Sequence, residues 1–233
     1  MFITLEGIEG SGKTTQLKNI TGFLEGRGRK CLVTREPGGT AIGKKIRSVL
    51  LNPDSKGMEP LTELLLYVAD RAEHVKKIIR PALAAGKTVL CDRFFDATVV
   101  YQGYARGLDL ALIHRLHRRV LEDLMPDVTI LFDLPPKIGL LRAWNQINNG
   151  NRAGVETRFE KEALTFHEKI RAGYLEIARL EPERFCIVDA AQDKVSVEKE
   201  TIECLKIALK RKIKKQECLN CLKCAKMPKA KTI

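Results

Sequence analysis

Short apolar runs alternate with longer amphipathic segments along the whole chain. Five runs are rich in Val, Ile, Leu and Phe and show little of the two-residue alternation of half-exposed strands. They are residues 2–6, 30–35, 88–92, 128–133 and 185–189. Helices are expected over 13–27, 40–51, 59–85, 109–124, 136–147, 158–180 and 194–213, with Pro81 kinking or shortening the third. Strands that alternate with helices predict an α/β fold of three layers, in which helices flank a central five-stranded parallel sheet.

The composition predicts a globular protein that does not enter a membrane. The chain has 233 residues, of which 44% are apolar, and this is enough for a buried core. No apolar run approaches the roughly 20 residues that span a bilayer, and the first residues show no features of a signal peptide. We therefore expect a cytoplasmic protein without a disulfide framework. The scattered cysteines at 31, 91, 186 and 204 are interpreted as small, mostly apolar side chains.

Most of the net charge of +12 belongs to the end of the chain. Ten Lys or Arg residues and one acid, Glu217, give residues 206–233 a charge of +9, which leaves +3 for residues 1–205. A body of low net charge offers no extended patch to a nucleic acid. We divide the chain into one domain over 1–213 and a basic tail over 214–233, which is expected to be disordered. The tail contains C-x2-C-x2-C, one ligand short of a usual zinc site, so a site shared between chains or an iron–sulfur cluster stays open.

The stretch GIEGSGKTT at 7–15 is a complete phosphate-binding loop, with Gly7, four variable residues and then Gly12, Lys13 and Thr14. Its glycines let backbone N–H groups surround an anion, Lys13 reaches the outer phosphates, and Thr14 offers a hydroxyl to Mg²⁺. A predicted strand precedes the loop and a predicted helix follows it, as in P-loop nucleoside triphosphate hydrolases. The loop indicates that nucleotide phosphate is bound, but it does not indicate the reaction.

Charged residues stand at the ends of four predicted strands: Glu6, Arg35, Asp92 and Asp133. Because ligands of open parallel sheets bind at the carboxyl ends of the strands, these residues are expected to converge on one edge. Asp92 can contribute to a Mg²⁺ shell, and Arg93 can grip a phosphate with two N–H groups. Alternatively, Asp92 and Arg93 only cap the loop that follows the strand.

Two short motifs carry candidate contacts to a substrate. TREPGGT at 34–40 places Arg35 and Glu36 beside the expected crevice, although a Pro-Gly-Gly turn would also explain it. In YVADR at 67–71, Tyr67 and Arg71 share a helix face and can stack on and bond a base. Spacing alone favours the alternative, a core Tyr beside a solvated Arg.

A polar segment over about 143–157 has the composition of a mobile flap, and Arg142, Arg152 and Arg158 surround it. Arginines on a flap that closes over phosphates would neutralise charge in the transition state. An exposed loop with ordinary surface charge is the alternative.

Four motifs in this order and spacing resemble the thymidylate kinase family: FITLEGIEGSGKTTQ, TREPGGT, LLLYVADRAEH and DRFFDATVVYQG. The resemblance covers about residues 1–210 and leaves out the tail. It implies transfer of the γ-phosphoryl group of ATP to dTMP, giving dTDP and ADP, with Mg²⁺ as the cofactor. It also implies a homodimer, formed through helix faces such as 59–80.

The resemblance assigns residues to each ligand. ATP would contact Gly7, Ile8, Glu9, Gly10, Ser11, Gly12, Lys13, Thr14 and Thr15, together with Arg142, Ala191 and Gln192. The segment Ala190–Gln192 would lie near adenine. Mg²⁺ would be held by Thr14 and Asp92. The acceptor dTMP would contact Glu9, Arg35, Glu36, Pro37, Arg47, Tyr67, Arg71, Arg93, Thr98, Tyr101 and Gln102.

The implied roles at the acceptor's sugar and phosphate are specific. Glu9 would meet the 3′-hydroxyl, and Tyr101 would lie against C2′ and disfavour a ribose. Arg93 would align the acceptor phosphate, with Arg35 and Arg47 nearby.

The thymine edge would bond to Arg71, with Tyr67 stacked on the base where the family more often has Phe. Thr98 and Gln102 would complete this base pocket.

The phosphate loop differs from that of one branch of the family, in which an arginine inside the loop supplies transition-state charge. Here the variable residues are Ile8, Glu9, Gly10 and Ser11. The chain therefore resembles the branch that uses flap arginines. The expected catalytic residues are Lys13, Glu9, Arg93, Arg152 and Arg158.

Three alternatives stay open at this stage. The first is a kinase for another nucleoside monophosphate. The second is a nucleotide-dependent switch, although the chain lacks the N-K-x-D motif that reads guanine. The third is a nucleic-acid-binding ATPase, which only the basic tail supports.

Overall fold

The structure is a computed structural model that describes residues 1–150 and 156–225, with side chains up to residue 214. Five strands form one parallel sheet in the order β2-β3-β1-β4-β5. They are β1 (Phe2–Glu6), β2 (Cys31–Arg35), β3 (Thr88–Asp92), β4 (Val128–Asp133) and β5 (Phe185–Asp189). The predicted five-stranded parallel sheet is confirmed, and each strand lies within one residue of its expected bounds.

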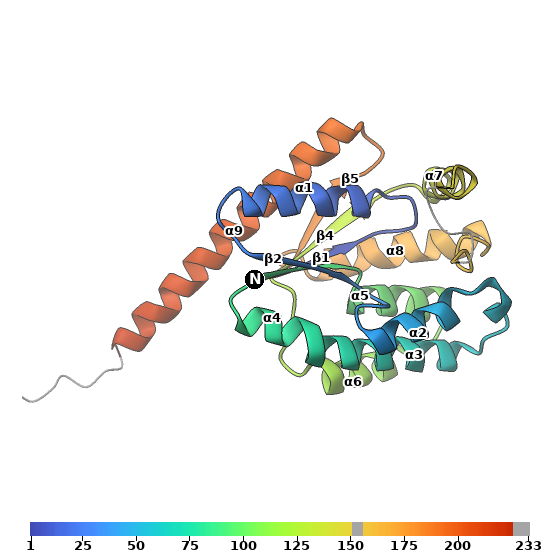
Figure 1. Cartoon of the computed structure of the whole chain (residues 1–233), viewed down its shortest axis with the longest axis horizontal. Coiled ribbons are helices and arrows are strands. Elements are labelled where there is room, and N and C mark those ends of the chain that lie inside the picture. Colours follow the sequence, from blue (N-terminus) through green and yellow to red (C-terminus); the bar gives the residue numbers. More distant parts are fainter. Residues whose placement is uncertain (151–155, 226–233) are drawn as a thin grey trace, which may run out of the picture.

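Helices cover both faces of the sheet, as Figure 1 shows, with α1 and α9 on one face and the remaining large helices mainly on the other. The helices are α1 (Lys13–Glu25), α2 (Ala41–Leu51), α3 (Pro60–His74), α4 (Arg80–Ala84), α5 (Phe95–Thr98), α6 (Leu110–Leu121), α7 (Pro136–Asn148), α8 (Leu164–Leu180) and α9 (Lys194–Ala225). Shorter segments are the 3₁₀ turn η1 (Pro53–Ser55) and the π-helical η2 (Val75–Ile79) and η3 (Val99–Ala105). Within the described part of the chain, no helix is long and apolar enough to cross a membrane.

The helix expected over 59–85 forms without a break, because η2 and α4 continue α3. Pro81 lacks an N–H and cannot donate to the carbonyl four residues earlier, and the wider π-helical turn lies directly before it. The helical stretch over 95–105 was not expected. Val99, Val100 and Gly103 disfavour a helix, and packing of η3 against α8 overrides that preference. The helix expected from 158 begins at Leu164.

The last helix is longer than expected. α9 continues to Ala225, so the backbone of 214–225 is helical where disorder was expected. This stretch is rich in Lys, Leu, Gln and other helix formers and contains no Gly or Pro. The boundary of the domain at 213 stays a prediction, and the three cysteines of the tail lie beyond the described side chains.

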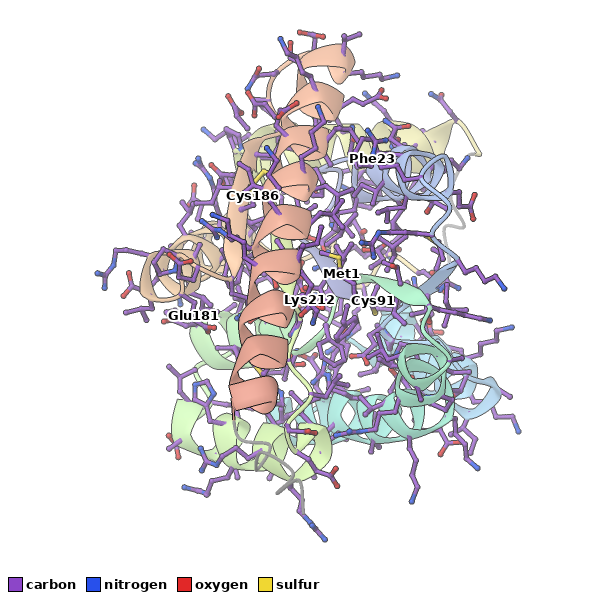
Figure 2. All side chains as sticks on the ribbon, turned by 90° about the vertical axis from the view of Figure 1, so that its left-hand side faces the viewer. Met1, Phe23, Cys91, Glu181, Cys186 and Lys212 are labelled. Carbon is purple, nitrogen blue, oxygen red and sulfur yellow. A yellow bond between two sulfur atoms is a disulfide. The ribbon has the colours of Figure 1, made fainter. Side chains whose placement is uncertain are left out.

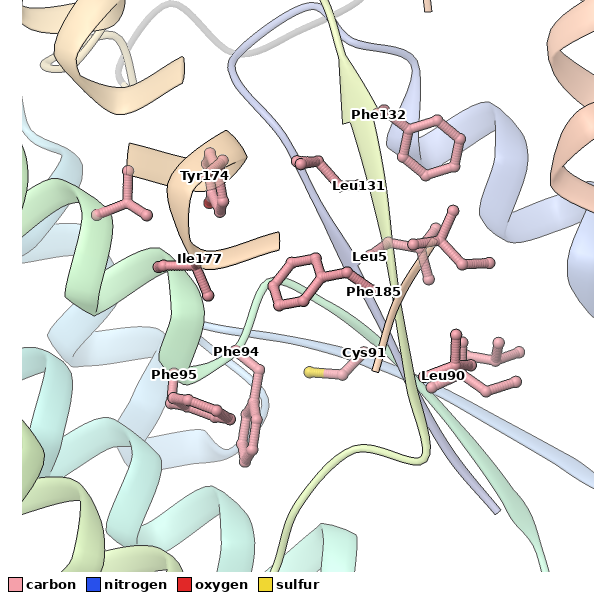
Figure 3. Packing of buried hydrophobic residues seen from close by; sticks show 14 of the residues in the cluster. Leu5, Leu90, Cys91, Phe94, Phe95, Leu131, Phe132, Tyr174, Ile177 and Phe185 are labelled. Atoms are coloured by element: carbon pink, nitrogen blue, oxygen red, sulfur yellow. The ribbon is translucent and has the colours of Figure 1, made fainter. Parts of the chain in front are cut away.

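Apolar side chains pack on both faces of the central strands. Figure 3 shows Leu131 and Phe132, neighbours in β4, pointing to opposite sides of the sheet. The side that faces α8 holds Phe94 and Phe95, whose rings meet edge to face at 5.7 Å between centroids. This covering of both faces explains the continuous apolar runs that predicted the strands.

One pair of cysteines differs from the expectation. Cys186 in β5 and Cys204 in α9 form a disulfide, with their Cα atoms 6.0 Å apart (Figure 2). The interpretation of these two residues as free apolar side chains is therefore wrong, while Cys31 and Cys91 are free thiols. The pairing depends on how α9 packs against β5, and the spacing of cysteines along the chain does not report that packing.

Candidate active site

A cavity of 640 Å³ lies at the carboxyl ends of β1, β2 and β3. The parallel sheet turns this edge into a meeting point for loops that are far apart in the sequence. All the residues assigned to dTMP line the cavity, namely Glu9, Arg35, Glu36, Pro37, Arg47, Tyr67, Arg71, Arg93, Thr98, Tyr101 and Gln102. The phosphate loop from Glu9 to Thr15 lines the same cavity, and so does Asp92. The sequence motifs therefore describe one site rather than several.

The phosphate loop wraps around the side chain of Lys13. Gly10 has φ 72° and Gly12 has φ 90°, a region of backbone conformation that other residues rarely adopt. Lys13 Nζ donates to the carbonyls of Gly7 at 2.9 Å and Ile8 at 2.8 Å, and it lies 3.2 Å from Ser11 Oγ. Burial and the charge of Arg93 lower the pKa of Lys13 to about 8, so the ammonium charge is intact at neutral pH.

The first turns of α7 press directly on the phosphate loop. A Cβ atom on Gly10 would lie 2.1 Å from the carbonyl oxygen of Gly139, and one on Gly139 would lie 2.5 Å from that of Glu9. Farther along α7, Arg142 Nη1 donates to the carbonyl of Ala190 at 2.9 Å. The segment assigned to adenine therefore lies beside α7, although Arg142, Ala191 and Gln192 do not line the main cavity.

Arg93, Glu9 and Tyr101 form the centre of the cavity. Arg93 Nη2 donates to Glu9 Oε1 at 2.9 Å, and the Tyr101 hydroxyl donates to the same oxygen at 2.6 Å. Burial alone would raise the pKa of Glu9, but the charge of Arg93 and the contact with His167 outweigh it, so the net shift is downward. Arg93 has φ 66°, a strained conformation for a residue that is not glycine.

A buried acid holds this strained turn in place. Glu6 accepts hydrogen bonds from the backbone N–H of Phe94 and from the Tyr174 hydroxyl, both at 2.7 Å. The Tyr174 oxygen lies 3.4 Å from Arg93 Nη1. Burial, followed by the charge of Asp96, raises the pKa of Glu6 to about 7. The sequence marked Glu6 only as a strand-end acid, and nothing in the sequence indicated Tyr174.

Arg71 is almost wholly buried, and its orientation is fixed by the protein. Its N–H groups donate to Glu36 Oε2 at 2.8 Å, His117 Nε2 at 3.1 Å, the Phe94 carbonyl at 3.1 Å and Thr98 Oγ1 at 2.9 Å. A guanidinium has five N–H groups, so one remains for a ligand. Glu36 is also bound by His74 Nδ1 at 2.8 Å. Glu36 thus acts by positioning Arg71, and its role toward a substrate stays a prediction.

Arg47 and Gln102 have partners that the sequence did not indicate. Arg47 donates to both carboxylate oxygens of Glu156, at 2.9 and 2.7 Å, and to the carbonyl of Pro37 at 3.0 Å. Gln102 Nε2 donates to Glu63 Oε1 at 2.7 Å. The contacts with Glu156 and Glu63 join positions more than thirty residues apart. The periodicity of the sequence does not predict contacts at such separations.

The thymidylate kinase family model matches residues 5–201 of this chain. The chain belongs to the thymidylate kinase family. It is similar to the thymidylate kinase of Desulfosudis oleivorans, at 60% identity over 190 residues that cover 82% of this chain and 89% of the relative. The thymidylate kinase of Desulforapulum autotrophicum is 58% identical, with 82% and 84% covered. The crystal structure of thymidylate kinase from Ehrlichia chaffeensis is 35% identical, with a TM-score of 0.69, and the match covers 88% of this chain and 98% of that one.

The oxygen atoms near the phosphate loop fit the Mg²⁺ that this family implies. Asp92 Oδ1 is buried without a hydrogen-bond partner among the described residues, and Thr14, in the first turn of α1, lines the same cavity as Asp92. Mg²⁺ takes oxygen ligands and is usually held by one or two protein groups together with substrate phosphates. The described residues contain no cluster of three His, Cys, Asp or Glu that would hold a metal by itself.

The flap arginines expected from the family pattern are placed differently from the other site residues. Arg152 lies outside the described residues. Arg158 is buried, donates to the Leu50 carbonyl at 3.1 Å, has Nη2 2.5 Å from Glu63 Oε2, and does not line the cavity. A catalytic role for Arg158 therefore requires it to leave Glu63, and this role stays a prediction.

The contact between Gly139 and the loop gives a test of the donor site. Gly139→Ala should raise the KM for ATP by up to about 100-fold, because its Cβ displaces the loop backbone from the phosphates. Gly22→Ala in α1 is the control, since a Cβ there meets nothing within 4 Å. ATP titration and circular dichroism would show the effect. Normal ATP binding by a folded Gly139→Ala protein would contradict this account of the loop.

Proposed function

We propose that this chain transfers the γ-phosphoryl group of ATP to dTMP, giving dTDP and ADP. The observation that carries the proposal is the arrangement of a single cavity. The phosphate loop, the proposed base contacts Arg71 and Gln102, and the hydrogen-bonded pair of Arg93 and Glu9 all line it, which supports two nucleotides bound in one cavity. A nucleotide hydrolase or switch has no use for the second, base-binding wall.

Phosphoryl transfer needs positioned and charge-stabilised phosphates more than it needs a covalent partner. Lys13 binds the outer phosphates of ATP, and Arg93 aligns the acceptor phosphate, with Arg35 and Arg47 beside it. Glu9 accepts a hydrogen bond from the sugar 3′-hydroxyl. Tyr101, held by Glu9, lies against C2′ and leaves no room for a 2′-hydroxyl.

The base is held on the opposite wall from the phosphate loop. The free N–H of Arg71 donates to a carbonyl of thymine, and Tyr67 stacks on the ring with Thr98 at its edge. The adenine of ATP lies toward Arg142, Ala191 and Gln192.

Thr14 and Asp92 would hold Mg²⁺, which would neutralise phosphate charge when bound. The protein's own part is to keep the Thr14 hydroxyl at the start of α1 and the Asp92 carboxylate at the end of β3. We place the protein in the cytoplasm, where it binds neither nucleic acid nor membrane.

A panel of acceptors tests the proposed function. With ATP and Mg²⁺, dTMP should give the highest kcat/KM for ADP release among dTMP, dUMP, UMP, CMP, AMP and GMP. Arg71→Ala should lower kcat/KM for dTMP by about 10- to 100-fold through the lost hydrogen bond to the base, while the Kd for ATP stays near the wild-type value. Because the change also leaves the buried Glu36 without its guanidinium, the melting temperature has to show that the variant is folded. A better acceptor than dTMP would overturn the assignment of the base pocket.

The transition-state charge is assigned to the flap arginines, because no residue of the phosphate loop other than Lys13 is basic. Alanine at both Arg152 and Arg158 should lower kcat by a factor of about 10³ or more. Because Arg158 also pairs with Glu63, unfolding has to be excluded by the melting temperature. A folded double variant whose kcat stays within about threefold of wild type would remove both arginines from the mechanism.

We also propose a homodimer through α2 and α3. Both helices expose large apolar side chains: Ile42, Val49, Leu61 and Leu65 are each about half exposed. A second copy related by a two-fold axis would cover them. Light scattering should give twice the mass of 26.2 kDa, and Leu61→Glu with Leu65→Glu should give the mass of one chain. A wild-type mass of one chain would exclude the dimer.

A further inference from the structure

Glu63 in α3 is a fully buried acid behind the wall of the base pocket. It is not itself among the residues that line the cavity. Its Oε1 accepts a hydrogen bond from Gln102 Nε2 at 2.7 Å. Two guanidinium groups lie against it as well: Arg158 Nη2 is 2.5 Å from Oε2, and Arg106 Nε is 3.4 Å from Oε1. Gln102 is the one of these three partners that borders the cavity.

The chemistry of Glu63 fixes the orientation of the Gln102 amide. With two guanidinium groups against it, Glu63 is a carboxylate, which accepts hydrogen bonds and has none to donate. The amide must turn its nitrogen toward Glu63, because the opposite orientation would set oxygen against oxygen. Gln102 Oε1 has no partner among the described residues. This oxygen is therefore the acceptor that Gln102 can offer to a ligand in the cavity.

A pyrimidine base distinguishes the two orientations of that amide. Thymine and uracil carry an N3–H, which donates to an oxygen acceptor. Cytosine has a bare N3 with a lone pair beside an amino group, so it needs a donor at the same place. An amide held with Oε1 toward the base satisfies thymine and uracil and repels cytosine.

We propose that Glu63 is the positioning residue that makes the base pocket select an N3–H base: it locks the Gln102 amide with its oxygen toward the substrate. The proposal rests on the proposed function, since it requires that the base of the acceptor lies against Gln102. It adds a determinant of specificity that no substrate touches.

Glu63→Gln tests the proposal, because glutamine both donates and accepts and so allows Gln102 to turn over. The ratio of kcat/KM for dTMP to that for dCMP should fall at least about tenfold, which corresponds to one mispaired hydrogen bond. The ratio for dTMP to dUMP should stay unchanged, since both bases carry an N3–H. A general loosening of the pocket would lower all three activities together and leave the first ratio in place. A folded Glu63→Gln enzyme that keeps the wild-type dTMP to dCMP ratio overturns the proposal.

The matched control is Glu59→Gln at the start of the same helix. Glu59 is exposed and makes no capping hydrogen bond, so both ratios should equal those of wild type.

The acceptor panel with the wild-type enzyme distinguishes failure of the proposed function from failure of the role of Glu63. If dTMP is not the best acceptor of the wild-type enzyme, the proposed function fails. If dTMP is preferred and Glu63→Gln does not change the ratio, only the role of Glu63 fails.

Gln102→Met completes the test, because methionine has similar length but no group to orient. On its own it should lower the dTMP to dCMP ratio at least about tenfold. In this background, Glu63→Gln should have no further effect on that ratio. A second tenfold change would mean that Glu63 acts by another route, which overturns the proposal. If Glu63→Gln does not fold, an unchanged ratio in Gln102→Met alone is enough to overturn it.

Discussion

A buried guanidinium needs a carboxylate partner, and the cavity is organised around that constraint. Arg71 is held by Glu36, Arg93 by Glu9 and Arg47 by Glu156. Arg71 is buried, and leaving its charge unpaired would cost several kcal/mol, whereas Arg93 and Arg47 are partly exposed and need their partners less. In all three pairs the acid also fixes the direction of the guanidinium. Substrates that carry phosphates then meet positive groups already in place, which reduces the reorganisation that charge stabilisation would otherwise require.

The same constraint decides which acids are available to a ligand. Glu36 stands in a motif at a strand end and resembles a substrate contact, yet both of its oxygens are occupied by Arg71 and His74. Glu63 is in a similar position with Gln102 and Arg158. By contrast, Asp92 keeps a buried oxygen without a partner among the described residues, as a metal ligand should. Glu36 and Glu63 thus orient neighbouring side chains, whereas Asp92 keeps an oxygen that the described residues leave without a hydrogen bond.

The sequence predicted the sheet closely because strands buried on both faces are continuous apolar runs, and it predicted the cavity because the motifs follow those strands. It did not predict the partners behind the motifs. Tyr174 reaches Glu6 from a distant helix, and the pairing depends on how α8 crosses the sheet. The sequence did not predict the helical segment that carries Tyr101 and Gln102, because its valines and glycine have low helix propensity. Local patterns report burial and periodicity, whereas these contacts depend on docking between elements.

The backbone contact between Gly10 and Gly139 has a consequence for the design of inhibitors. Gly10 lines this part of the cavity and Gly139 packs against it, and the two main chains leave no space for a side chain at either position. A compound that binds there meets a surface that a single substitution cannot reshape without moving the phosphate loop. The proposed base pocket is different, because side chains such as Gln102, rather than backbone, line that part of the cavity. Resistance by point mutation would thus arise more readily on the acceptor side than along this contact.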